Sequence, residues 1–165
     1  MHTFDKYLIP PLAAAAATVA LAGSGWARDS VVNVSLWDKG AEAGMATGLG
    51  MGMTGANMSM APMAIRLSTH SVAAGKVTFK VTNEAKDTIH EMVVAPIRSD
   101  AKPLPYIAAE NEIDEKKVGD LGEVSELDPG QSGSLTLDLK PGKYVLFCNV
   151  PGHYMSGMWA ELTVN

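Results

Sequence analysis

The feature that most constrains the fold is a series of short apolar stretches separated by turn residues. The seven stretches share period-2 alternation or runs of β-branched residues, and each is bounded by Gly, Pro, Asn or Asp. They are VVNVSLW (31–37), MAIRLS (63–68), KVTFKVTN (76–83), TIHEMVVAPI (88–97), SLTLDL (134–139), KYVLFCN (143–149) and MWAELTVN (158–165). Seven short strands joined mostly by turns predict an all-β, antiparallel sandwich.

Two segments interrupt this pattern. Residues 98–128 are polar and acidic and form one long connection, in which residues 106–118 could carry a short helix. Residues 40–62 are rich in Gly, Ala and Met and almost uncharged, and their glycines disfavour both helix and strand. We therefore expect residues 40–62 to form a mobile loop or arm.

The first 22 residues have the pattern of an export signal. Lys6 precedes an apolar run over residues 8–22, which ends in the small-x-small sequence at residues 20–22, and residues 25–27 offer a later cleavage site. The alternative, an uncleaved membrane anchor, is disfavoured because the run is short and rich in alanine. We predict a signal peptide over residues 1–22, with cleavage as late as residue 27, and a single periplasmic domain over residues 23–165.

The charge and the cysteine count exclude some classes of protein. Removing residues 1–22 takes away one of 13 basic and one of 18 acidic residues, so the net charge stays at −5. This balance argues against nucleic acid or an anionic membrane as the main partner, and it allows docking to a basic patch on another protein. Cys148 is the only cysteine, so no disulfide forms within the chain and stability comes from the core or from a ligand.

The stretch CNVPGHYMSGM (148–158) brings Cys148, His153 and Met158 close together in the sequence, between the last two strands. Taken singly, each is more often a core or solvated side chain. Together, a thiolate, an imidazole and a thioether suit copper, whereas zinc rarely takes a thioether and calcium takes none of the three. A His₂Cys plane needs a second histidine. His90, at a strand start, fits better than His70, which lies in a polar turn.

These residues resemble the cupredoxin family, which includes plastocyanin, azurin and rusticyanin. The resemblance covers about residues 62–165 and rests on VTNEAKDTIHEMVV, on the PG-x-Y strand start and on the C-x4-H-x4-M spacing, which is most similar to rusticyanin-type bacterial cupredoxins. It implies a Greek-key β-sandwich or barrel of about seven to eight strands. It also implies one copper ion, with His90, Cys148 and His153 as equatorial ligands and Met158 as the axial ligand.

The sequence departs from this family at one position. Many cupredoxins carry Asn after the first histidine ligand, and its side chain ties the two ligand loops together, whereas this chain has Glu91. The backbone N–H of Glu91 is expected to reach the Cys148 sulfur. Asn149 is a candidate to replace the missing side-chain tie.

The resemblance implies a monomeric electron carrier that serves redox partner proteins. The sequence contains no pairing of a nucleophile with a base, so it does not indicate an enzyme. One feature favours a different function. Six of the ten methionines lie between residues 45 and 63, at positions 45, 51, 53, 58, 60 and 63. Clustered thioethers are suitable ligands for monovalent copper. The alternative function is therefore copper tolerance or delivery. The competing interpretation of these methionines is a low-complexity linker that binds no metal.

Overall fold

The computed structural model describes residues 29–98 and 103–165, and within them eleven strands form two large sheets and one small one. The first sheet has the order β2 (Met63–Leu67), β1 (Ser30–Asp38), β4 (Gly75–Asn83) and β9 (Ser132–Leu139). The second has the order β3 (Ser71–Val72), β11 (Trp159–Val164), β10 (Gly142–Phe147), β5 (His90–Pro96) and β8 (Gly122–Leu127). The predicted signal peptide lies outside the described residues.

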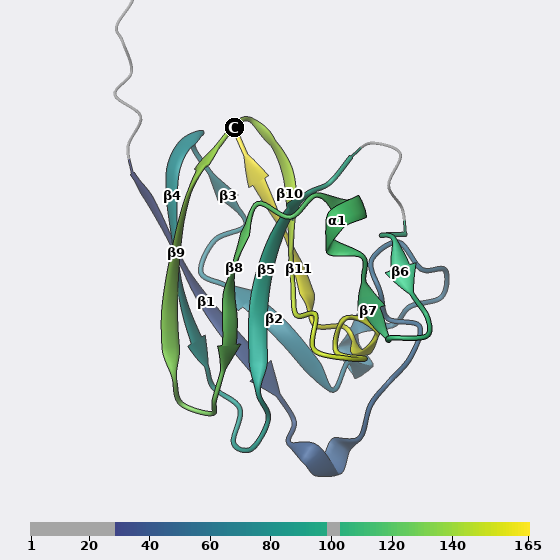
Figure 1. Ribbon diagram of the computed structural model, residues 1–165. Coiled ribbons are helices and arrows are strands. Elements are labelled where there is room, and N and C mark those ends of the chain that lie inside the picture. Colours follow the sequence, from purple (N-terminus) through teal and green to yellow (C-terminus); the bar gives the residue numbers. More distant parts are fainter. Residues whose placement is uncertain (1–28, 99–102) are drawn as a thin grey trace, which may run out of the picture.

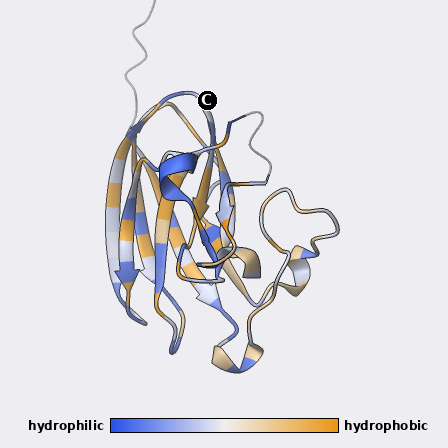
Figure 2. Ribbon diagram, turned by 45° about the vertical axis from the view of Figure 1, so that its right-hand side comes forward, coloured by the Kyte–Doolittle hydropathy of each residue, from blue (hydrophilic) through white to orange (hydrophobic). Residues whose placement is uncertain are grey.

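The two large sheets face each other as two layers with the core between them (Figure 1). Apolar and polar residues alternate along the strands, as the orange and blue bands of Figure 2 show. On β1, Val32, Val34 and Leu36 are buried, and they share a core cluster with Phe79 and Leu146 of the two sheets. The predicted all-β sandwich is confirmed.

The sandwich is not wholly antiparallel, which corrects one expectation. β1 pairs with β4 in parallel, and β3 pairs with β11 in parallel. Tight turns force neighbouring strands to be antiparallel, but these two pairs join strands that are distant in sequence, so no turn fixes their direction.

The long connection contains more structure than the sequence predicted. The expected helix is present as α1 (Glu115–Val118), which Asp114 caps by accepting a hydrogen bond from the backbone N–H of Lys117. A hairpin of β6 (Tyr106–Ile107) and β7 (Glu112–Ile113) precedes it, and β8 follows. Figure 1 places α1, β6 and β7 beside the loop that joins β10 to β11.

Residues 40–62, here called the Met-rich loop, form a loop as expected, but Met51 near its centre packs in the core. It holds two short 3₁₀ turns, η1 (Ala41–Ala43) and η2 (Met58–Met60). Between them, Met51 is 1 % exposed and packs in a second core cluster with Phe147 and Tyr154. Gly50 permits this packing, since a Cβ there would lie 2.7 Å from a Tyr154 ring carbon. The segment is therefore anchored to the core through Met51.

No helix in the described part of the chain has the length and apolar character needed to cross a membrane.

Candidate metal centre

The loop from Cys148 to Met158 is held as a closed hairpin by its own backbone. Cys148 follows β10 directly, and its N–H donates to the carbonyl of Met158 at 3.1 Å. The N–H of Met158 donates to the carbonyl of His153 at 3.1 Å, and the N–H of His153 donates to that of Val150 at 3.0 Å. The turn η3 (Tyr154–Ser156) completes the loop. These bonds fix His153 relative to Cys148 without any metal.

His90 reaches the same place from the neighbouring strand. It is the first residue of β5, which pairs with β10 next to Cys148, with Val93 opposite Phe147. The imidazole therefore points toward the hairpin, although His90 and Cys148 are 58 residues apart in sequence. Sheet pairing explains why the two belong to one site.

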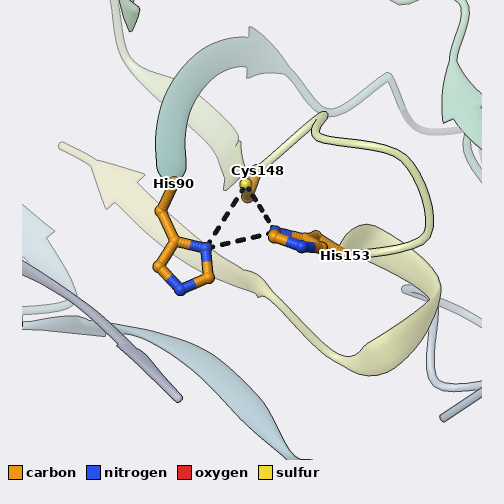
Figure 3. A group of neighbouring side chains, drawn as sticks. All are labelled: His90, Cys148 and His153. Atoms are coloured by element: carbon orange, nitrogen blue, oxygen red, sulfur yellow. Dashed lines mark hydrogen bonds between the residues drawn. The ribbon is translucent and has the colours of Figure 1, made fainter. Parts of the chain in front are cut away.

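The structure brings three of the four predicted ligands together (Figure 3). The Cys148 Sγ lies 3.3 Å from the His153 Nδ1 and 4.0 Å from the His90 Nδ1, and the two Nδ1 atoms are 3.1 Å apart. The three residues are 0–5 % exposed. Nitrogen and thiolate donors stand about 2.0–2.3 Å from a bound zinc ion, so three donors around an ion of similar size lie about 3.5–4 Å apart. The donor group fits one metal ion.

Met158 and His70 differ sharply in their placement. Met158 is fully buried in the core cluster that contains Cys148, and its backbone is hydrogen-bonded to both Cys148 and His153. His70 is exposed, and its Nδ1 lies 3.0 Å from the carbonyl oxygen of Glu161. The structure thus brings His90 to the donor group and leaves His70 outside it.

Burial shifts the ionisation of these donors. It raises the pKa of the Cys148 thiol to about 12, because the hydrogen bonds from the N–H groups of Glu91 and Val150, which lower this pKa, offset only part of the effect of burial. Burial, together with nearby His90, lowers the pKa of His153 to about 4, and burial also lowers the pKa of His90. Both imidazoles are therefore neutral near pH 7, which is the form that binds metals. The thiol needs a positive charge nearby to ionise.

Glu91 supplies the tie between the two ligand segments. Its N–H donates to the Cys148 Sγ at 3.5 Å, as predicted, and its Oε1 accepts a hydrogen bond from the N–H of Asn149 at 3.0 Å. The side chain of Asn149 points elsewhere, bonding to the backbone of Ile113 and to Glu115. The expectation that Asn149 replaces the missing Asn side chain was wrong, because the longer Glu side chain reaches across. Burial, with a contribution from Glu123, raises the pKa of Glu91 to about 7.

Sequence reasoning missed one polar neighbour of the site. Asp38, the last residue of β1, places its Oδ2 3.2 Å from the His90 Nε2. The two residues are 52 positions apart, and no local motif connects them. The only signal in the sequence was one acidic residue at the end of an otherwise uncharged strand.

Comparisons with known proteins agree with this geometry. Residues 50–165 match the family described as copper binding proteins of the plastocyanin/azurin family. The chain belongs to this family. The match begins within the Met-rich loop and extends to the C-terminus, and it includes all four predicted ligands. The cofactor is one copper ion, for which the buried His and Cys donors form a suitable group.

Solved cupredoxins have a similar fold. Rusticyanin from Thiobacillus ferrooxidans is 16 % identical, with a TM-score of 0.52 over 82 % of this chain and 76 % of that one. Reduced auracyanin from Roseiflexus castenholzii is 19 % identical, with a TM-score of 0.49 over 85 % of this chain and 99 % of that one. A comparison with curated protein sequences finds no match.

Proposed function

We propose that this cupredoxin is an exported type 1 copper protein that transfers single electrons between redox partner proteins. His90, Cys148, His153 and Met158 would hold the copper ion, through two imidazole nitrogens, one thiolate and one thioether. The observation that carries this proposal is the buried group of one thiol and two Nδ1 atoms, all within 4.8 Å of one another.

Copper would supply the one-electron chemistry by alternating between its monovalent and divalent forms. The chain's part is to keep its donors in place in both forms. Cys148 and Met158 are joined through the backbone, Glu91 bonds to both the sulfur and the N–H of Asn149, and the surrounding residues are buried. A donor group held in this way needs little rearrangement when an electron arrives or leaves.

The proposed location and partners rest on the sequence. Residues 1–22 have the pattern of an export signal, which supports a periplasmic protein. The net charge of −5 favours a monomer in solution and partners with a basic docking surface. If so, the rate of electron exchange with such a partner falls as the salt concentration rises.

A redox titration of the copper-loaded protein tests the proposed function. We expect one electron per protein, taken up and released reversibly, with no loss of copper over repeated cycles. The Cys148→Ser variant is the control, and it should lose the reversible wave. Loss of copper on each reduction would contradict the role of an electron carrier.

A second function, copper tolerance or delivery, is supported by the exposure of three methionines. Met45, Met58 and Met60 are 53 %, 38 % and 70 % exposed. Met45 and Met58 also reach the ligand loop, because their methyl carbons lie 2.8 and 3.2 Å from where a Cβ would stand at Gly152 and Gly157. Accessible thioethers next to the copper site would allow monovalent copper to bind outside the core.

A further inference from the structure

The carboxylate of Asp38 is built into the wall of the metal centre. Its side chain is 5 % exposed, and its Oδ2 lies 3.2 Å from the Nε2 of His90, whose side chain is 0 % exposed. Its other oxygen, Oδ1, accepts a hydrogen bond from the N–H of Gly40 at 2.9 Å. The backbone around Asp38 is also held, since Lys39 donates to the carbonyl of Pro62 at 2.8 Å. Asp38 is therefore a fixed group rather than a surface side chain.

This contact determines which nitrogen of His90 carries the proton. A carboxylate oxygen only accepts hydrogen bonds, so the Nε2 of His90 must be the donor. In a neutral imidazole the Nδ1 then carries the free lone pair. Nδ1 is the atom that faces the Cys148 sulfur and the His153 Nδ1 (Figure 3). The contact with Asp38 thus leaves the ligand atom of His90 ready to bind a metal.

The charge of Asp38 also has a direct effect. Its two oxygens accept hydrogen bonds from the N–H of Gly40 and from the Nε2–H of His90, and these bonds favour the negatively charged carboxylate. A carboxylate that accepts the distal N–H of a metal-bound histidine makes the imidazole a stronger base. A stronger base and a nearby negative charge favour the ion of higher charge.

We propose that Asp38 is a positioning residue of the copper centre, which aims the Nδ1 of His90 at the Cys148–His153 group and favours divalent over monovalent copper. This inference rests on the proposed function. It goes beyond the family match, which begins at residue 50 and does not include β1. Asp38 lies before the matched residues in sequence, and the folded sheets, in which β1 pairs with β4, bring it into contact with His90 at the start of β5.

The test compares Asp38→Asn, Asp38→Ala and a control, Asp87→Asn. Asn has the same shape as Asp and can still accept the hydrogen bond, but it lacks the charge. Asp87 is an exposed carboxylate three residues before His90, so its removal changes the net charge equally without this contact. We expect Asp38→Asn to lower the affinity for divalent relative to monovalent copper about tenfold, which is a rise of about 59 mV in reduction potential. Asp38→Ala should raise the reduction potential further, and Asp87→Asn should not raise it.

Nuclear magnetic resonance of the copper-free protein gives a second, independent result. The ¹⁵N shifts of His90 should show the Nε2–H form in the wild type and a mixture of the two neutral forms in Asp38→Ala. An Nδ1–H form in the wild type, or equal potentials for Asp38→Asn and Asp87→Asn, would overturn the role of Asp38. If the wild type binds no copper, the proposed function fails, while the ring proton of His90 still decides whether Asp38 positions it.

Discussion

At the scale of single residues, burial keeps the donors of the site in their neutral forms when no metal is bound. The thiol of Cys148 has its pKa raised to about 12 because it is buried, and His153 has its pKa lowered to about 4 for the same reason. The copper-free protein therefore holds a neutral thiol and neutral imidazoles near pH 8. A bound cation changes the ionisation of the thiol alone, because cysteine binds a metal as the thiolate, whereas the imidazoles bind in the neutral form that they already have.

It follows that binding of a divalent metal releases one proton. Zinc is the best probe because it takes nitrogen and thiolate donors and has no redox chemistry. At pH 8 we expect one proton per zinc ion, measured by calorimetry in buffers of different ionisation enthalpy, and around this pH the apparent affinity should rise about tenfold per pH unit. Cys148→Ala is the control and should release none. Release of no proton by the wild type would remove Cys148 from the ligand set.

The axial position is tested by Met158→Gln. An amide oxygen is a harder donor than a thioether, so it should favour divalent copper and lower the reduction potential, while the coloured site is kept. Voltammetry and the absorption spectrum measure both effects. A control is Met92→Gln at a fully buried methionine of β5, which should reduce stability instead. An unchanged potential in Met158→Gln would mean that another group is axial.

At the scale of elements, the ligand loop and the Met-rich loop support each other. Leu49 donates its N–H to the carbonyl of Met155 at 3.0 Å and accepts a hydrogen bond from the Trp159 Nε1 at 2.8 Å. The N–H of Met51 donates to the Tyr154 hydroxyl at 2.8 Å. The Met-rich loop thus forms the outer wall of the hairpin that holds His153 and Met158.

Gly157→Ala tests this contact between the two loops. Gly157 has φ +96°, and a Cβ there would lie 2.8 Å from the Cβ of Ala61. Gly55 is the matched control, because its φ is +79° but a Cβ there would meet nothing within 4 Å. Both alanines carry the cost of a positive φ, and only Gly157→Ala crowds the loops. We expect it to lower the free energy of unfolding by roughly 1–3 kcal/mol more than Gly55→Ala does. Equal losses of unfolding free energy for the two variants in denaturant titrations would show that the two loops are not in tight contact at Gly157.

The copper-handling alternative belongs to the same element. Replacing Met45, Met58 and Met60 with Leu removes three exposed sulfurs and keeps most of the apolar volume. If the loop binds monovalent copper, the copper content of the reduced protein should fall from more than one ion to one. The control replaces the buried Met51 and Met63 in the same way and should leave the content unchanged. One copper ion in every protein would discard the alternative.

At the scale of the whole molecule, local patterns were enough to predict the sandwich but not its details. The seven predicted strands, which have alternating apolar residues or continuous apolar runs, are present. β8 was missed because Val124 is its only buried residue and charged side chains hide the alternation. The pairing of β1 with β4 depends on residues that are distant in sequence.

The site shows the same limit. The resemblance predicted the ligands His90, Cys148, His153 and Met158, and the structure brings the first three together. Neither the reach of Glu91 to Asn149 nor the contact of Asp38 with His90 could be predicted, because both join segments that only the folded sheets bring into contact.

The absorption spectrum of the protein loaded with divalent copper tests the central claim most directly. If Cys148 is a copper ligand in a trigonal site with His90 and His153, the wild type should show an intense blue thiolate-to-copper band. Cys148→Ser should bind copper without this band and keep the circular dichroism of the folded sandwich. A colourless wild type with one copper ion bound, or a blue Cys148→Ser variant, would contradict the account.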